Sequence, residues 1–442
     1  MDAHSVTLQK SKCMGCTDCI KRCPTEAIRV RSSKAQIIEA RCIDCGNCIR
    51  ICRNGAKKAA TDQLEMMKRY THRIALPAPS FYAQFPKAPG VEYILEALLE
   101  MGFTDYFEVA IAAEVVTSAT YDYLKKATHF PIISSACPAI VRLVQSRFPS
   151  LIPHILPILS PMELAARYVK AQYAKRGMDL KEVGVFFISP CPAKATEIRY
   201  PKGIEQSMVD GVLSMQDLYK PMRDLIGKVT PKQKQQSTYR GLNWATPTGG
   251  MDENQIKGYM AVDGIENVLS ILEKVEDGTL NHMTFIEAMA CTGGCLGGAL
   301  AIENPYISRS TLKKWIQKAK QSEKQMINGE YLKVLDAVSQ IPYFYETPIM
   351  PSSVLSLSPN RIKALEMMER IQKIYETLPQ IDCGCCGAPT CHCFAEDVVR
   401  QGVNVEACIF MLRRKIKQLS DEMQQLAYTA IPTENNLEKH KE

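Results

Sequence analysis

Four cysteines in three short phrases of this chain have the residue type and number to hold one iron–sulfur cluster. They are Cys137 in ISSACPA, Cys191 in ISPCPAKATE, and Cys291 and Cys295 in EAMACTGGCLGG. Four cysteine thiolates are the usual ligands of a 4Fe–4S cubane. The phrases lie far apart in the sequence, so only folding can bring the thiolates together. We therefore expect the folded chain to hold a cubane between them.

Eight more cysteines, between residues 13 and 52, form two copies of the spacing C-x2-C-x2-C-x3-C. A proline, Pro24, follows the first copy, as in the bacterial two-cluster ferredoxins that this run resembles. In such runs the fourth cysteine of each copy ligates the other cluster. One expected ligand set is Cys13, Cys16, Cys19 and Cys52, and the other is Cys23, Cys42, Cys45 and Cys48. A pair of zinc knuckles is the alternative, but zinc sites rarely carry two interleaved four-cysteine runs. The β-branched residues between the copies predict a short hairpin.

The last six cysteines stand in a third group that begins C-G-x-C-G-x-P-x-C. This group resembles the 4Fe–4S module of Rnf-type electron-transport subunits and corrinoid iron–sulfur proteins. The resemblance selects the ligands Cys383, Cys386, Cys391 and Cys408 and leaves Cys385 and Cys393 spare. A redox-active cysteine pair is the alternative, and it would need surroundings that favour a thiolate. The segment after this group is expected to be a helix whose apolar residues, among them Phe410, Leu412 and Ile416, belong to a core.

The middle of the chain alternates strand-like and helical segments. Its short apolar runs are RIALPAP, FPIISSA, VGVFFIS and HMTFIEAMA. This alternation predicts α/β layers with sites at the ends of the strands. The polar stretch 231–244 is expected to be a loop.

These patterns predict an α/β protein (α+β overall) with three domains and a tail. The expected parts are a two-cluster 4Fe–4S ferredoxin-like domain over 1–60, a central domain of two α/β lobes over 70–345, a small and mostly helical 4Fe–4S domain over 346–425, and a flexible tail over 430–442.

The three phrases of the central domain resemble the signature segments of the iron-only (FeFe) hydrogenases, which carry the H-cluster. The resemblance implies that the four cysteines bind a cubane and that Cys295 also bridges to a diiron unit with carbonyl, cyanide and an azadithiolate bridge. It also implies that Lys194 contacts one cyanide and that Met289 lies beside the cofactor. Pro79 and Ser80 match residues that contact the other cyanide and the bridge. With the two terminal regions, the expected cofactors are this H-cluster and three accessory 4Fe–4S clusters.

The sequence departs from the catalytic hydrogenases at positions that carry protons. Their first phrase reads TSCCP, whereas Ala136 stands here in place of the first cysteine, and alanine cannot relay a proton. An ungapped comparison with the catalytic hydrogenases shows further differences at positions that relay protons or lie next to them. The residues of this chain at those positions are Val116, Ala119, Leu156, Met162 and Ser189. The carboxylates that remain candidates for a different route are Glu114, Glu163 and Glu197.

Together these features resemble the sensory FeFe hydrogenases of group D. The resemblance implies an iron-only hydrogenase of low activity that binds dihydrogen, splits it slowly and reversibly, and passes electrons through the accessory clusters to a signalling or redox partner. Maturation enzymes for the H-cluster are further implied partners. One alternative is a catalytic or bifurcating hydrogenase with a non-standard proton path. Another is a non-catalytic iron–sulfur scaffold like the eukaryotic hydrogenase-like proteins.

The composition of the chain indicates its general class, its expected binding partners and its location. The chain has 442 residues, of which 46% are hydrophobic and 23% charged, as in ordinary globular proteins. Its formal charge of +7 counts every cysteine as neutral, and thiolate-bound clusters would offset it, so we expect no nucleic-acid binding. The sequence shows neither a membrane-spanning stretch nor an N-terminal export signal, so a cytoplasmic location is expected.

Overall fold

The computed structural model describes residues 4–232, 235–252, 254–326 and 329–430. The predicted tail over 430–442 lies outside these ranges except for its first residue. Contacts divide the chain into a larger unit, residues 1–12 and 38–355, and a smaller unit, residues 13–37 and 356–442. The domain boundaries expected from the sequence remain a prediction.

Two parallel β-sheets form the framework of the larger unit. One has the strand order β6 (Asp105–Tyr106), β5 (His72–Pro77), β8 (Val183–Ser189) and β9 (Gly211–Ser214). The other has the order β10 (Tyr259–Asp263), β11 (Phe285–Met289) and β7 (Ile132–Ile133). The four apolar runs of the sequence form β5, β7, β8 and β11, so the predicted α/β architecture is confirmed.

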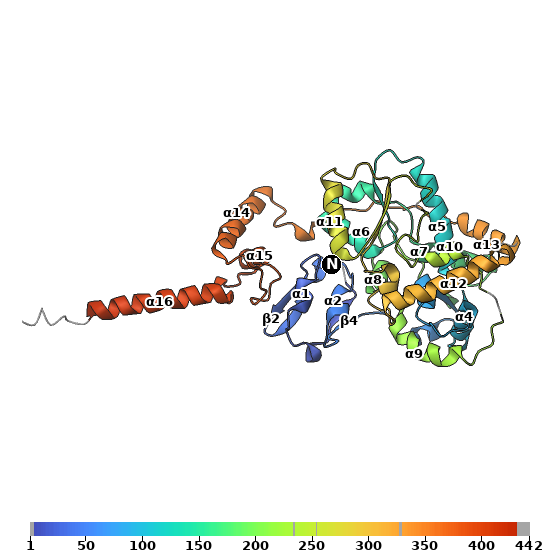
Figure 1. The fold of residues 1–442 in the computed structure, drawn as a ribbon, viewed down its shortest axis with the longest axis horizontal. Helices are drawn as coiled ribbons and strands as arrows, with labels where there is room; N and C mark the ends of the chain where they lie inside the picture. Colours follow the sequence, from blue (N-terminus) through green and yellow to red (C-terminus); the bar gives the residue numbers. More distant parts are fainter. Residues whose placement is uncertain (1–3, 233–234, 253, 327–328, 431–442) are drawn as a thin grey trace, which may run out of the picture. The chain divides into compact units, whose positions relative to one another are not determined.

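Helices join the strands of the larger unit, and two more, α12 and α13, follow its last strand (Figure 1). They are α2 (Asn47–Ile51), α3 (Pro79–Tyr82), α4 (Val91–Glu100), α5 (Val109–Leu124), α6 (Pro138–Arg147), α7 (Pro161–Lys175), α8 (Pro192–Arg199), α9 (Met215–Ile226), α10 (Tyr239–Asn243), α11 (Ile265–Glu276), α12 (Pro305–Met326) and α13 (Gly329–Ser339). Helices α4, α5 and α7 share a hydrophobic core with the four-stranded sheet, and α6 and α11 share another with the three-stranded sheet.

Strand β8 shows why these sheets form where they do. All seven of its residues are buried, as is usual for a parallel strand covered on both faces. Its register pairs Leu76 of β5 with Phe187, and Pro77 with Ile188. The two strands therefore end at the same edge, and the segments that follow them emerge side by side.

The segment 231–244, of which residues 233 and 234 lie outside the described ranges, contains helix α10 rather than only a loop. Gly241 lets α10 lie against α5, because a Cβ there would stand 2.2 Å from the Ala110 carbonyl oxygen. Leu242 is fully buried. The expectation holds for residues 231, 232 and 235–238, whereas Tyr239–Asn243 form a short helix, fixed by tertiary packing, that the polar composition did not indicate.

The second half of the ferredoxin-like run belongs to the larger unit. There β1 (Val6–Leu8) pairs antiparallel with β4 (Lys57–Ala59). The buried Asp44 carboxylate accepts hydrogen bonds from the Ser5 N–H at 2.8 Å and from the Thr196 hydroxyl at 2.7 Å. It also lies 3.3 Å from the guanidinium of Arg142. This buried carboxylate thus ties the cysteine-rich segment to helices α6 and α8.

The smaller unit combines the first half of that run with the C-terminal region. Its elements are α1 (Asp18–Lys21), β2 (Ile28–Arg31), β3 (Lys34–Ile37), α14 (Arg361–Thr377), α15 (Cys391–Gln401) and α16 (Ile409–Ala430). Strands β2 and β3 pair antiparallel, which confirms the predicted hairpin.

The hairpin packs directly on the C-terminal cysteine motif. The Val30 N–H donates to the Gly387 carbonyl at 2.8 Å, and a Cβ at Gly387 would stand only 1.9 Å from the Val30 carbonyl oxygen. Arg29 donates to both oxygens of the buried Asp397, at 2.6 and 2.9 Å, and Arg31 lies 2.7 Å from the same carboxylate. A bidentate, buried ion pair is strong and geometrically specific.

Helix α16 contradicts the expectation of a core helix. Phe410 and Met411, at its start, pack against the small core of the C-terminal region. Leu412 and Ile416 are exposed by 42% and 58%. Leu412 and Ile416 do share one face of a helix, as their spacing predicts, but no other element of the described unit covers that face. Among the described residues no helix is long and apolar enough to cross a membrane.

We expect Asp44→Asn to destabilise the larger unit. The substitution keeps the shape of the side chain but leaves the buried Arg142 without a full counter-charge, which costs about 3 kcal/mol. Thermal unfolding followed by circular dichroism measures the effect. The control is Asp122→Asn, because Asp122 forms an exposed ion pair with Lys125. Equal unfolding midpoints for the two variants would contradict the role of Asp44.

Candidate functional site

The three cysteine phrases and the segment after β5 line one cavity of the larger unit. Its volume is about 120 Å³. Strands β7 and β11 lead into Cys137 and Cys291, and β5 and β8 lead into Pro79 and Cys191. The carboxyl ends of parallel strands thus deliver these residues to one place. The lining residues expected from the sequence are Pro79, Ser80, Ala136, Cys137, Met162, Cys191, Lys194, Met289, Cys291 and Cys295.

Two of the cysteines begin helices. Cys137 is the N-cap of α6 and Cys191 the N-cap of α8, and a proline follows each at the first helical position. Proline suits that position because the helix needs no N–H there. The positive end of each helix dipole therefore lies at a cysteine, where it favours a thiolate over a thiol.

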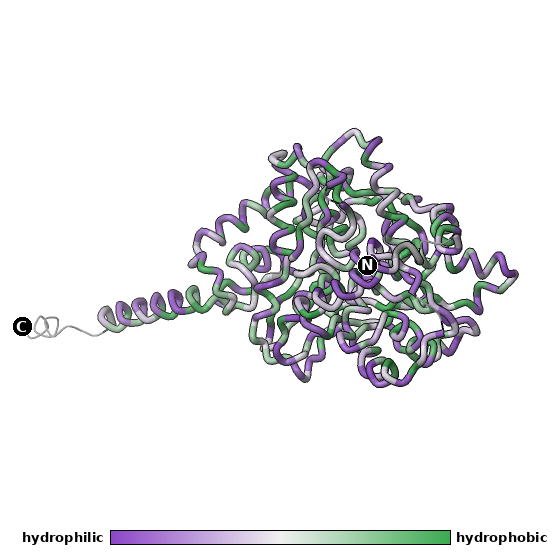
Figure 2. The backbone as a smooth tube through the Cα atoms, turned by 45° about the vertical axis from the view of Figure 1, so that its right-hand side comes forward, coloured by the Kyte–Doolittle hydropathy of each residue, from purple (hydrophilic) through white to green (hydrophobic). Residues whose placement is uncertain are grey.

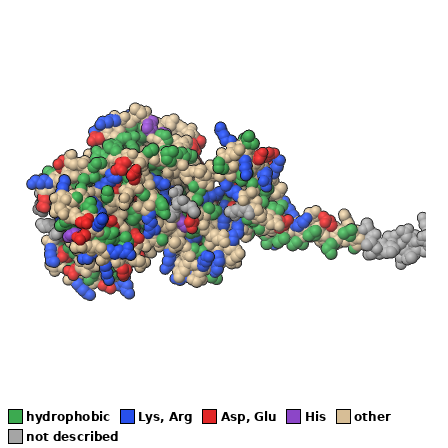
Figure 3. All heavy atoms as spheres, turned by 180° about the vertical axis from the view of Figure 1, so that it is seen from behind, with side chains coloured by type: hydrophobic (Ala, Val, Ile, Leu, Met, Phe, Trp, Pro, Cys, Tyr) green, Lys and Arg blue, Asp and Glu red, His purple; other side chains and the backbone are tan. Residues whose placement is uncertain are grey.

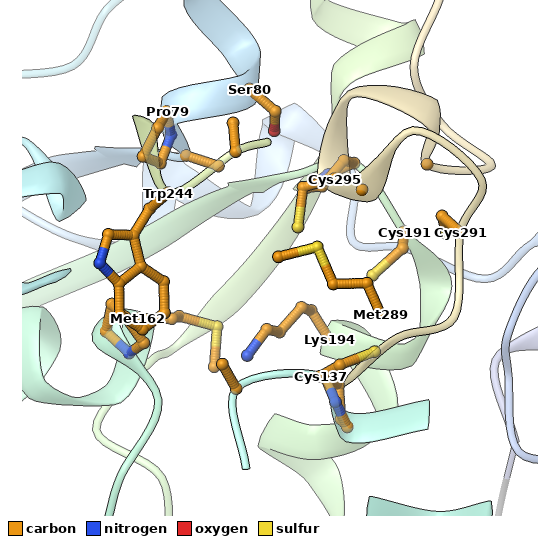
Figure 4. Close-up of a pocket in the computed structure, with 18 of the residues that line it drawn as sticks. Pro79, Ser80, Cys137, Met162, Cys191, Lys194, Trp244, Met289, Cys291 and Cys295 are labelled. Carbon is orange, nitrogen blue, oxygen red and sulfur yellow. The ribbon is translucent and has the colours of Figure 1, made fainter. Parts of the chain in front are cut away.

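The other two cysteines lie on a tight glycine-rich turn. Gly294 has a φ of +67°, in the left-handed region that glycine adopts without strain. A Cβ at this position would stand 3.0 Å from both the Met289 Sδ and the Ala245 carbonyl oxygen. The glycine therefore allows the turn to lie against the cavity wall. Cys295 points into the cavity, which accounts for its exposed surface (Figure 4).

The cysteines affect each other electrostatically. Burial, with a smaller contribution from the neighbouring cysteines, raises the pKa of the Cys191 thiol to about 11 and that of Cys295 to about 12. Burial and the neighbouring cysteines also raise the pKa of Cys291 well above its usual value. Without a bound cation these thiols are neutral at pH 7. Iron binding as thiolates would therefore release protons.

Two polar groups that line the cavity, the Lys194 ammonium and the Ser80 hydroxyl, suit an anionic guest. Burial lowers the pKa of Lys194, but the Glu197 carboxylate 2.6 Å away and the cysteines outweigh this, so the net shift is upward and the ammonium stays charged. The Ser80 hydroxyl is buried and has no hydrogen-bond partner among the described residues. Lys194 and Met289 point into the space between the cysteines on one side and Trp244 and Met162 on the other (Figure 4).

The donor set suits a cluster rather than a single ion. Within the described part of the chain, no three His, Cys, Asp or Glu side chains lie close enough to hold one metal ion. A cubane takes one thiolate on each of its four irons, so its ligands stand further apart. Four converging thiols, a buried cation and an unsatisfied hydroxyl fit a cubane with an attached anionic group.

Comparison with known families agrees with this geometry. The model for the iron-only hydrogenase large subunit, C-terminal domain, matches residues 71–250 and 222–299, which together span more than half of the chain. The chain belongs to the iron-only hydrogenase family. A 4Fe–4S dicluster domain matches residues 5–53 of this hydrogenase-type protein, and a family of Fe–S cluster domains matches residues 378–410. It is thus an FeFe-hydrogenase-like iron–sulfur protein with a ferredoxin-like N-terminal region.

Individual relatives include hydrogenases and an assembly factor. The periplasmic Fe hydrogenase large subunit of Nitratidesulfovibrio vulgaris is 27% identical over 67% of this chain and 86% of its own length. Iron hydrogenase 1 of Clostridium pasteurianum is 24% identical over 71% and 67%. The cytosolic Fe–S cluster assembly factor NAR1 homolog of Schizosaccharomyces japonicus is 31% identical, but over only 23% and 18%. A solved structure of apo FeFe-hydrogenase HydA1 from Chlamydomonas reinhardtii covers 64% of this chain and 94% of its own, at 15% identity and a TM-score of 0.48.

Apolar residues surround the part of the cavity that is expected to lack a proton relay in this hydrogenase-type protein. Ala136 and Met162 line the cavity itself. Val116 and Leu156 line a smaller adjoining pocket. That pocket shares Ala136 with the cavity, but also Ser134, Trp244 and Glu287. Ala119 is buried nearby on α5. The Ser189 hydroxyl donates to the Cys191 carbonyl at 2.8 Å and accepts from its N–H at 3.2 Å, so it fixes the cysteine loop.

The three carboxylates proposed as substitutes have structural partners. Glu197 pairs with Lys194. Glu163 accepts from the Ser207 hydroxyl at 2.5 Å and from the Met208 N–H at 2.9 Å. Glu114 accepts from the hydroxyls of Thr238 and Tyr331, at 2.8 and 2.7 Å. The cavity-lining residues named above include none of these three.

Among the lining residues that sequence reasoning missed, Glu287 and Trp244 bear on function. Glu287 lies on β11, where the two-residue period of a strand gives it the same face as Met289. Burial raises its pKa to about 7, opposed by hydrogen bonds from Tyr259 and the Gly250 N–H. The sequence feature that could have revealed Glu287 is its position as the one acidic residue inside the apolar run HMTFIEAMA. Trp244 is the last residue of the stretch expected to be a loop, and its indole donates to the Thr117 hydroxyl at 2.8 Å.

The N-terminal cysteines preserve their duplication in three dimensions. The Cys23 Sγ accepts from the Ala27 N–H, and the Cys52 Sγ accepts from the Ala56 N–H, both at 3.2 Å. Short helices carry the third cysteine of each copy and begin after a residue with positive φ, Thr17 before α1 and Gly46 before α2. N–H donors toward sulfur stabilise a thiolate. The ligand sets of the two clusters remain predictions.

The C-terminal cysteines lie in two different surroundings, and which of them bind a cluster remains a prediction. A small cavity is lined by Cys383, Cys385, Cys386, Cys391 and Cys408. Cys385, expected to be spare, thus lines the same cavity as the four expected ligands. Cys393 instead lies on the hairpin side of α15, fully buried, with its Sγ 2.5 Å from the Arg29 guanidinium. Burial raises its pKa. Cys393 is therefore a structural residue of the hairpin interface, whereas Cys385 is exposed beside Cys383.

Glu287 predicts a pH dependence of stability. Its folded pKa of about 7 lies above its ordinary value of 4.5, so its contribution to stability is lost as pH rises between these values. At pH 8 the buried, ionised carboxylate lowers the free energy of unfolding by about 3 kcal/mol relative to its protonated form. The unfolding midpoint of Glu287→Gln should therefore exceed that of the wild type at pH 8 and approach it at pH 5. Glu273→Gln, on the exposed face of α11, is the control. Parallel pH profiles for Glu287→Gln and the wild type would refute the assignment.

Proposed function

We propose that this protein binds dihydrogen at an H-cluster and splits it slowly and reversibly, as a hydrogen or redox sensor. The observation that supports the proposal is the shared cavity of four cysteines, Lys194 and Ser80. Membership of the iron-only hydrogenase family supports dihydrogen as the ligand. The residues that would make turnover fast are replaced, which favours detection over rapid catalysis.

Each residue of the cavity has a defined task in this proposal. Cys137, Cys191, Cys291 and Cys295 would hold the cubane and the diiron unit attached to it. That unit would supply the chemistry by which dihydrogen is bound and split. Lys194 would place a positive charge beside the anionic part of the cofactor, and Ser80 would supply a hydrogen-bond donor that the described residues leave unused. Pro79 and Met289 give the remaining walls their apolar character.

In this proposal, the transfer of protons out of the cavity limits the rate of hydrogen turnover. The methyl group of Ala136 has no exchangeable proton, and Val116 and Leu156 continue the apolar surface into the adjoining pocket. A proton released in the cavity therefore has no side-chain acceptor at these positions. Turnover is expected to be slow in both directions, because the same route serves uptake and release.

Electrons would leave through the three accessory 4Fe–4S clusters. Cys45 packs against the same hydrophobic core as Cys137 and Cys191, which supports electron exchange between the second ferredoxin-like cluster and the cubane. In the smaller unit, Lys21 of α1 donates to the carbonyls of Asp382 and Pro389, beside the C-terminal cluster motif. This contact supports exchange between the first ferredoxin-like cluster and the C-terminal one. A partner protein would read the redox state of these clusters.

Two other functions have a specific observation in their favour. Glu287, with a pKa near neutrality at the cavity wall, favours catalysis through a different proton route. The similarity to the NAR1 homolog favours a scaffold that carries the cubane without a diiron unit.

Infrared spectroscopy tests the cofactor. After co-expression with H-cluster maturation enzymes, the protein should show carbonyl and cyanide bands, which lie where protein does not absorb. The variant Cys295→Ala should lose them, whereas Cys393→Ala should keep them. Iron without these bands in the wild type would favour the scaffold.

Restoring a thiol tests the proton argument. Ala136→Cys should raise hydrogen turnover by about tenfold, less than the roughly hundredfold of a full relay, because Val116 and Leu156 remain apolar. A gas-chromatographic assay with a chemical reductant measures the rate. Ala113→Cys, which places a thiol in the same cavity from α5, is the matched control. An unchanged rate in Ala136→Cys would mean that protons use another route, with Glu287 as the first candidate. Wild-type turnover equal to that of catalytic hydrogenases would exclude the sensor proposal.

A further inference from the structure

Helix α16 carries a line of large apolar side chains that are exposed to solvent. They are Ile409, Leu412, Ile416, Leu419, Met423 and Leu426, with exposed fractions from 42% at Leu412 to 71% at Met423. Successive members are alternately three and four residues apart. This is the heptad repeat of a coiled coil, whose seam positions recur every 3.5 residues. We call these six residues the α16 seam.

The helix extends away from α14 and α15 of its own unit (Figure 1). Every residue from Leu412 to Tyr428 is exposed. Hydrophobic and hydrophilic segments alternate along it (Figure 2), and apolar side chains line it between charged ones (Figure 3). Most of the stability of a helix in a protein comes from the packing of its apolar face, and α16 has little such packing in its own unit, so a partner that buries its seam would stabilise it.

The width of the seam indicates the class of partner. Helices that lie on a membrane or pack into a globular core have a broad apolar face. On α16, Lys417, Gln418, Asp421, Gln424 and Gln425 occupy positions outside the seam. A narrow line of two apolar residues per seven suits another helix of the same kind.

The register shows that a second copy is a complete partner. In an antiparallel pair, Ile409 lies opposite Leu426 of the second copy, Leu412 opposite Met423, and Ile416 opposite Leu419. All six seam residues are then matched, and the two-fold axis passes between Leu419 and Ile416. Such an isologous interface closes at two chains.

The charges on α16 select the antiparallel direction. Its first half is basic (Arg413, Arg414, Lys415 and Lys417) and its second half contains Asp421 and Glu422. Antiparallel pairing sets Lys415 against Glu422 of the second copy, twice by symmetry. Parallel pairing would set Lys415 against Ser420 and place the two basic halves side by side. We propose that the protein forms an antiparallel homodimer through the α16 seam.

Sedimentation of the reconstituted full-length protein tests this proposal. The wild type should be a dimer, and Ile416→Glu/Leu419→Glu should weaken association about a hundredfold or more, because it would bury four charges per dimer. Gln418→Glu/Gln425→Glu adds the same charge outside the seam and should remain dimeric. Circular dichroism and iron content confirm that each variant is folded. A monomeric wild type, or a seam variant that stays dimeric, would overturn the proposal.

Charge reversal tests the direction of the helices. Lys415→Glu alone and Glu422→Lys alone should each weaken the dimer about tenfold, because each replaces two attractions by two repulsions. The double variant should recover wild-type affinity. If the dimer depends on the seam but its affinity does not change in the Lys415 and Glu422 variants, the helices would be parallel and the proposed arrangement would be wrong.

Discussion

The site depends on one constraint: four thiols that repel one another as thiolates must be held close together inside the protein. The raised pKa values of Cys191, Cys291 and Cys295, caused first by burial and then by the neighbouring cysteines, express the cost of that arrangement. The fold meets it by ending parallel strands of two sheets at one cavity, so each cysteine stands on a segment anchored by a buried strand. Helix N-termini at Cys137 and Cys191 and the ammonium of Lys194 supply compensating positive charge. Sheet topology, helix starts and the buried lysine are thus parts of one electrostatic solution.

Much of this was predictable from the sequence, because the relevant signals are local. Cysteine spacing identified the groups of cysteines that the fold brings together, and apolar runs marked buried strands. The residues that were missed depend on distant packing. Glu287 is one acidic residue in an apolar run, and its place at the cavity follows only from which face of β11 turns inward. Trp244 reaches the cavity because Gly241 lets α10 rest on α5.

The C-terminal region contains two further examples of residues whose surroundings could not be predicted from the local sequence. Cys393 looked spare, yet it is buried against Arg29 of the hairpin, a residue distant in sequence. The apolar residues of α16 looked like core, but the described elements of its unit leave them exposed. Periodicity identifies which residues share a helix face and does not identify what covers that face. The partner of such a face must come from tertiary or quaternary structure.

The ion pair between Lys194 and Glu197 has a consequence for redox behaviour. With a carboxylate 2.6 Å from its ammonium, Lys194 presents less than a full positive charge to the cavity. An electron added to a group bound there gains correspondingly less stabilisation, so reduction is driven to more negative potentials than an unpaired lysine would give. The carboxylate thereby sets how strongly reducing the surroundings must be before the centre changes state.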